Sequence, residues 1–78
     1  MTSKSARALF KRRNISTGIL DWWIDRQHVG MSDEAVSAAV RERIGDREPA
    51  NVIEAAVRIA LDRHHENRGT YRLVTGSI

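Results

Sequence analysis

The chain contains no cysteine, and in a sequence of 78 residues this limits how a fold can be stabilised. A domain of this length hides only about 60% of its unfolded surface when it folds. Without cysteine, neither a disulfide nor a cysteine-based metal site can add stability. We therefore expect a single domain, and we expect it to form a homodimer that buries additional apolar surface.

The same sequence excludes several cellular settings. No apolar run approaches the roughly 20 residues that a membrane span needs. The basic N-terminus is not followed by the apolar stretch of a secretory signal. The lack of cysteine is typical of a reducing compartment. These features predict a cytoplasmic protein with no membrane partner.

Charge is distributed unevenly, although the net charge is only +3. Residues 21–66 carry ten acids and six arginines, and residues 67–78 carry two arginines. Residues 1–20 contain no acid and five basic side chains, which are Lys4, Arg7, Lys11, Arg12 and Arg13. A basic first quarter on a near-neutral body favours contact with a polyanion, although a solvated basic tail gives the same pattern.

Helix signals recur along the sequence and predict a mainly α fold of about four short helices. The first two helices are predicted from Ser3 or Ser5 to about Arg13, and from Ser16 or Thr17 to about Val29. Residues 14–16 form the turn between them. The inward stripe of the second helix is Leu20, Trp23, Ile24 and Gln27, with Ile19 at its flank. Gly30 is predicted to end this helix in the left-handed conformation.

The third and fourth helices have the clearest boundaries. Ser32 is a good N-cap, acids follow it in the first turn, and Gly45 ends the third helix. The fourth helix is predicted to begin within residues 46–49 and to end at Asn67 or Gly69. Its apolar stripe is wide enough to need partners on two sides, and consists of Val52, Ile53, Ala56, Val57, Ala60 and Leu61.

The last residues differ in character from the rest. Thr70–Thr75 is β-prone but too short to form a sheet alone. We predict one helical domain over residues 1–69, and a tail or short extended segment over residues 70–78. As a strand, this segment would pair with another chain.

No pattern of catalytic residues is present. The sequence lacks a glycine-rich phosphate loop, metal-ligand spacing and a nucleophile elbow. His64 and His65 are adjacent, so on a helix their side chains point about 100° apart and are poorly placed to bind the same metal ion. His64 falls on the apolar stripe, which places it at the edge of the core. Because so short a chain leaves little room for a pocket, we expect no enzyme activity, no cofactor and no metal.

The segment Arg7–Trp23, RALFKRRNISTGILDWW, resembles the helix-turn-helix of small repressors and transposase DNA-binding regions. The resemblance implies that the basic first helix and Ser16 and Thr17, at the start of a recognition helix, contact phosphates. Asn14 replaces the usual turn glycine, but asparagine tolerates the left-handed region. Asp21 and Asp25 depart from the pattern, because they are predicted on the face that would meet DNA.

A second segment, Arg26–Leu61, resembles the ribbon-helix-helix family of dimeric repressors, antitoxins and plasmid-partition proteins. The matching stretches are RQHVGMSDEAV, Gly45 and ANVIEAAVRIAL. This resemblance implies a ribbon-helix-helix dimer with a basic N-terminal extension, in which Arg26, His28 and Gly30 face the major groove. Residues 22–31 cannot both end a helix and form a strand, so the two interpretations compete there.

Both resemblances imply a sequence-specific protein that binds double-stranded DNA. We expect a small transcriptional regulator or accessory factor of a phage, plasmid or bacterial chromosome. Lys4 and the other basic residues of the first helix would bind phosphates. Ser16, Thr17, Arg26 and His28 would contact bases or neighbouring phosphates. The alternative is a protein-interaction module that binds a host or partner protein through Trp22 and the basic helix, unless Trp22 only fills the core.

Overall fold

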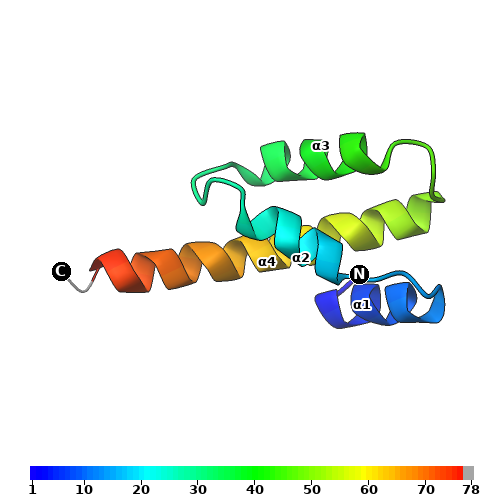
Figure 1. Ribbon diagram of the computed structural model, residues 1–78, viewed down its shortest axis with the longest axis horizontal. Helices are drawn as coiled ribbons and strands as arrows, with labels where there is room; N and C mark the ends of the chain where they lie inside the picture. Colours follow the sequence, from blue (N-terminus) through cyan, green and yellow to red (C-terminus); the bar gives the residue numbers. More distant parts are fainter. Residues whose placement is uncertain (77–78) are drawn as a thin grey trace.

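The protein folds around one long central helix. The computed structural model describes the backbone of residues 1–76 and the side chains of residues 1–70. It contains α1 (Ser3–Arg12), α2 (Gly18–Asp25), α3 (Asp33–Ile44) and α4 (Ala50–Gly76). Each of the first three helices packs on α4. In Figure 1, α1 and α3 lie on opposite sides of α4, α2 overlies its middle, and its C-terminal part extends past the other helices. The predicted mainly helical fold is confirmed.

The core is built on the first half of α4. Its buried residues are Val52, Ala55, Ala56, Val57, Ile59 and Ala60, whereas Asn51 and Glu54 are exposed. The expected need for several partners is confirmed, and burial extends beyond the predicted stripe to Ala55 and Ile59. The other helices contribute Ala6 and Phe10, Leu20 and Ile24, and Val36 and Val40. Packing against three helices covers this wide apolar side of α4 and leaves a polar side to solvent.

Local signals fix both ends of α3, as predicted. The hydroxyl of Ser32 accepts a hydrogen bond from the amide of Ala35 at 3.1 Å. Gly45 ends the helix with φ of 60°, and its amide donates to the carbonyl of Arg41 at 2.9 Å. Asn14 also adopts a positive φ, 59°, in the turn between α1 and α2. This confirms that Asn14 tolerates the left-handed region in that turn.

Two predictions in the N-terminal half are wrong, the capping residue of α1 and the end of α2. The N-cap of α1 is Thr2, whose hydroxyl accepts from the amide of Ser5 at 3.1 Å, so neither Ser3 nor Ser5 caps the helix. α2 ends at Asp25 rather than near Val29. The chain then forms turns, in which the ring of His28 accepts the amide of Gly30 at 3.0 Å. This local side-chain bond competes with helical bonds, and Gly30 does not adopt a positive φ.

The turns after α2 also bear on the ribbon-helix-helix interpretation. That fold needs a strand near residues 26–31, and the described backbone, residues 1–76, contains none. The amide of Met31 instead bonds the carbonyl of His28 at 3.0 Å, which closes a turn. The predicted ribbon of Arg26, His28 and Gly30 is therefore absent from the described backbone of this chain.

α4 continues beyond its predicted end at Asn67 or Gly69. The helix runs to Gly76 and so includes Thr70–Thr75, the segment expected to be extended. Once a helix is nucleated, each added residue costs little, so β-prone residues can join it. The last two residues of the expected tail, Ser77 and Ile78, lie outside the described residues. No helix within the described part has both the length and the hydropathy needed to cross a membrane.

Candidate nucleic-acid interface

α1 turns its basic side chains to solvent because its apolar stripe is held on α4. Ala6 and Phe10 are buried on one side of the helix. Lys4, Lys11 and Arg12 are exposed. Lys11 and Arg12 follow Lys4 by seven and eight residues, about two helical turns, so the three side chains share a side of α1 different from the buried one. Arg13 follows them as the exposed C-cap residue, and Arg7 is discussed below. We call Lys4, Lys11, Arg12 and Arg13 the basic surface.

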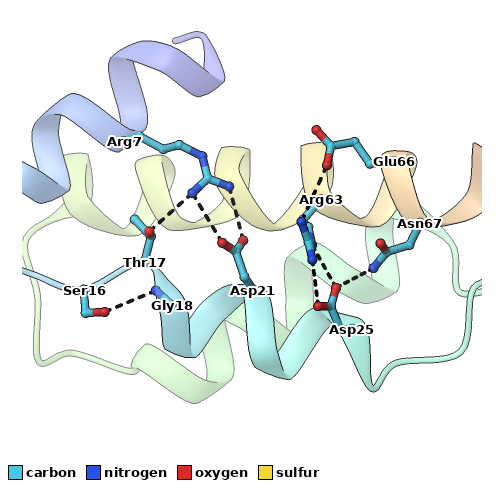
Figure 2. Close-up of polar contacts among 9 residues, drawn as sticks. All are labelled: Arg7, Ser16, Thr17, Gly18, Asp21, Asp25, Arg63, Glu66 and Asn67. Atoms are coloured by element: carbon cyan, nitrogen blue, oxygen red, sulfur yellow. Dashed lines mark hydrogen bonds and ion pairs between the residues drawn. The ribbon is translucent and has the colours of Figure 1, made fainter. Parts of the chain in front are cut away.

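The basic surface carries uncompensated charge. None of its four side chains forms an ion pair with an acid among the described residues. Arg7 behaves differently, because its guanidinium donates to both carboxylate oxygens of Asp21, at 3.2 and 3.4 Å. It also donates to the hydroxyl of Thr17 at 3.3 Å (Figure 2). Arg7, predicted as a phosphate contact, thus joins α1 to α2.

A hollow of about 500 Å³ lies at the turn between α1 and α2. It is lined by Arg7, Lys11, Asn14, Ile15, Ser16 and Thr17. The hydroxyl of Ser16 accepts the amide of Gly18 at 3.2 Å. Thr17 occupies the N-cap position of α2 but makes no capping bond with its side chain. The structure therefore brings Lys11, Ser16 and Thr17 to the lining of one hollow at the start of α2.

Each of the two acids of α2 pairs with an arginine of another helix. Asp21 is held by Arg7 of α1, and Asp25 accepts two hydrogen bonds from Arg63 of α4, each 2.8 Å long. Asn67 donates a third bond to Asp25 at 2.8 Å (Figure 2). The bonds from Arg63 and then Asn67 lower the pKa of Asp25 to about 2. The same contact raises the pKa of Arg63.

The solvent side of α2 is apolar rather than acidic. Ile19 is 69% exposed and Trp22 is 52% exposed. The guanidinium of Arg26 lies over the Trp22 ring, 4.0 Å from its centroid. Trp23 instead packs against the core, with Arg43 5.6 Å from its ring centroid. The two tryptophans therefore lie in different environments. Trp23 is partly buried against the core, on the inward stripe that the sequence predicts, and Trp22 lies at the surface.

Two predicted nucleic-acid contacts lie away from the others. Arg26 follows the last residue of α2, about 14 Å along the helix axis from Thr17. Its guanidinium also donates to the carbonyl of Trp22 at 3.1 Å. His28 is exposed and bonds the backbone of Gly30. The structure therefore does not place Arg26 and His28 with the residues at the α1–α2 turn.

The histidines of α4 have structural contacts. His64 is 1% exposed, and its Nε2 lies 2.9 Å from the carbonyl oxygen of Met31. Because a carbonyl only accepts, Nε2 donates this bond. His65 bonds the carboxylate of Asp33 at 2.9 Å, and this bond lowers the pKa of Asp33. Among the described residues, no three histidine or acidic side chains converge as metal ligands would.

Sequence reasoning missed the ion pairs that hold α2. The spacing of Asp21 and Asp25, four residues apart, places both on one side of a helix and is the only local signal. Their partners, Arg7 and Arg63, lie 14 and 38 residues away.

Comparison with known protein families, with curated proteins and with solved structures found no match.

Proposed function

We propose that the protein binds duplex DNA through the basic surface, as a small transcriptional regulator or accessory factor. The observation that carries the proposal is the separation of charge. Lys4, Lys11, Arg12 and Arg13 are exposed without acidic partners in the described part of the chain, whereas both acids of α2 are paired internally. A polyanion approaching α1 therefore meets four cations whose charge no acid of the described residues pairs with.

The dimensions of α1 suit a phosphate backbone. Lys4 and Lys11 are about 10 Å apart along the helix axis. Each DNA strand carries one phosphate per roughly 3.4 Å of its axis, so both side chains can reach phosphates of one duplex. Lys11 also borders the hollow at the start of α2, where Ser16 and Thr17 offer hydroxyl groups. The first amides of any helix lack intrahelical acceptors, and this adds a preference for anions there.

A salt titration tests the proposal. We expect Arg12→Ala combined with Arg13→Ala to weaken duplex binding and to reduce the slope of log K against log salt by about 2. Fluorescence anisotropy of a labelled duplex measures both quantities. Arg41→Glu is the matched control, because it changes the net charge by the same two units on α3, at an exposed position away from the basic surface.

The control should lower the affinity much less than the double variant and keep the slope. Equal effects of the two variants would mean that only net charge matters, and would reject a defined interface on α1. No binding of the wild-type protein to duplex DNA at low salt would reject DNA binding itself. Selection from random duplexes then tests sequence specificity, since a regulator enriches one motif.

A second candidate function is binding of a partner protein through Trp22 and α1. The exposure of Ile19 and Trp22 on one side of α2 favours it, because exposed tryptophan is enriched among residues that dominate protein interfaces. The two functions separate experimentally. A partner-binding module would show no affinity for duplex DNA at low salt, and Trp22→Ala would abolish a complex with a purified partner.

A further inference from the structure

Arg7 is the only cation of α1 that forms an ion pair among the described residues. Its guanidinium donates to both carboxylate oxygens of Asp21, at 3.2 and 3.4 Å, and to the hydroxyl of Thr17 at 3.3 Å (Figure 2). Thr17 is the N-cap residue of α2, and Asp21 lies in its first turn. These three bonds hold the charged end of Arg7 against α2.

The backbone position of Arg7, in contrast, belongs with the basic surface. Lys4 precedes it by three residues and Lys11 follows it by four, and these spacings place the three side chains on one side of a helix. Along the axis of α1, Arg7 lies about 4.5 Å from Lys4 and about 6 Å from Lys11. Its side chain is 40% exposed, and it lines the hollow at the start of α2 together with Lys11. A phosphate backbone that reaches both lysines therefore also passes Arg7.

A DNA phosphate and the carboxylate of Asp21 compete for the same guanidinium, because the planar fork of arginine donates two parallel bonds to either anion. The packing of α1 and α2 keeps Asp21 permanently beside Arg7, whereas a phosphate must be brought from solution. Within the described residues, Asp21 forms no other ion pair. Transfer of Arg7 to a phosphate would thus leave an unpaired carboxylate next to the polyanion, and the repulsion opposes the transfer.

We propose that Asp21 competes with DNA phosphates for Arg7 and thereby limits the affinity of the basic surface. In the wild type, the basic surface binds phosphates while Arg7 stays on Asp21. Loss of the Asp21 charge frees Arg7 as an additional phosphate contact between Lys4 and Lys11. This inference rests on the proposed DNA binding, and it gives Asp21 a role in setting the affinity through Arg7.

Asp21→Asn tests the competition, because it removes the charge of the competitor and keeps the shape of its side chain. We expect the variant to bind duplex DNA about threefold to tenfold more tightly at about 0.1 M salt. The slope of log K against log salt should become steeper by about 1, since one more phosphate contact releases about one more counterion. Fluorescence anisotropy of a labelled duplex measures both quantities, and circular dichroism confirms that each variant is folded.

Asp25→Asn is the matched control. It makes the same chemical change on the same helix, but the partner of Asp25 is Arg63 of α4, which keeps a second acid, Glu66, at 3.8 Å. The control should alter the affinity less than about twofold and leave the slope unchanged, since salt screens the change in net charge.

Arg7→Gln combined with Asp21→Asn identifies the side chain that makes the new contact. This double variant replaces the ion pair by two neutral side chains and keeps the net charge of the wild type. We expect it to lose both the gain in affinity and the added slope of Asp21→Asn.

Three results would overturn the inference while DNA binding by the basic surface stands. Equal effects of Asp21→Asn and Asp25→Asn would mean that only net charge matters. Unchanged affinity and slope in Asp21→Asn would mean that the pair with Arg7 only fastens the two helices. A gain that persists in the double variant would mean that Arg7 is not the added contact. If neither the wild type nor Asp21→Asn binds duplex DNA at low salt, the proposed function and the inference fail together.

Discussion

Asp25 shows at the level of a single residue how α2 is held in place. Three hydrogen bonds from α4 reach its carboxylate, two from Arg63 and one from Asn67. These bonds favour the ionised form, and so the pKa of Asp25 falls from 3.8 to about 2 on folding. Arg7 holds Asp21 in the same manner from α1. The short helix is thus fastened by one arginine from each of two neighbouring helices.

The lowered pKa of Asp25 predicts a pH dependence of stability. A carboxyl whose pKa is lower in the folded state contributes stability above its unfolded pKa, near 3.8, and this contribution is lost as the pH falls towards 2. We therefore expect Asp25→Asn to lower the free energy of unfolding at pH 7 by about 1 kcal/mol or less, because the pair is partly exposed. We also expect the variant to lose less stability than the wild type between pH 4 and pH 2.

Urea denaturation at several pH values measures this difference. Asp46→Asn is the control, since Asp46 is exposed and forms no ion pair among the described residues. Equal losses of stability on acidification in the Asp25 variant and the wild type would contradict the prediction.

At the scale of the elements, α3 is the helix whose ends depend most directly on its own sequence. Ser32 caps its start, Asp33 and Glu34 follow in the first turn, and Gly45 ends it at positive φ. Each signal acts through atoms only a few residues away, and so the boundaries of α3 could be predicted. α2 lacks a side-chain cap and depends on contacts with α1 and α4, and its predicted end was wrong.

The cap of α3 gives a prediction about stability. We expect Ser32→Ala to lower the free energy of unfolding by about 1 kcal/mol, because the amide of Ala35 loses its acceptor. Ser32→Asp should retain most of the stability, since a carboxylate accepts the same bond and favours the helix start. Ser37→Ala, within the same helix, should be neutral or slightly stabilising because alanine is the better helix former.

Chemical denaturation of the three variants measures these effects. If the Ser32→Ala and Ser37→Ala variants unfold at the same denaturant concentration, the hydroxyl of Ser32 does not stabilise α3 as a cap.

At the scale of the whole molecule, α4 organises the fold. The other three helices all contact it, and the hydrophobic core cluster of the described residues includes six residues of its first half. Its alanines allow close approach, while Ile59 supplies one of the largest fully buried side chains. The sequence shows a wide apolar stripe but does not show that Ile59, outside that stripe, is enclosed.

The enclosure of Ile59 can be tested by removing one methyl group. We expect Ile59→Val to cost about 1 kcal/mol of unfolding free energy, because the close-packed site cannot fully refill the space. Ile53→Val makes the same chemical change on α4, but Ile53 is only half-buried and lies outside the core cluster. It should cost less than half as much. Thermal or urea denaturation provides the comparison, and equal costs would show that the two sites are packed alike.

The sequence by itself determined the helical class, the turn at Asn14, the ends of α3 and the basic first helix, because capping groups, positive φ and charge act over a few residues. The tertiary structure alone decided which charges remain free. Arg7 looks like its basic neighbours in sequence, yet only it meets an acid, at Asp21. Asp25 likewise finds Arg63, 38 residues away, across the packed helices. Partners so distant in sequence leave no local signal, since their meeting depends on how α1 and α2 are packed on α4.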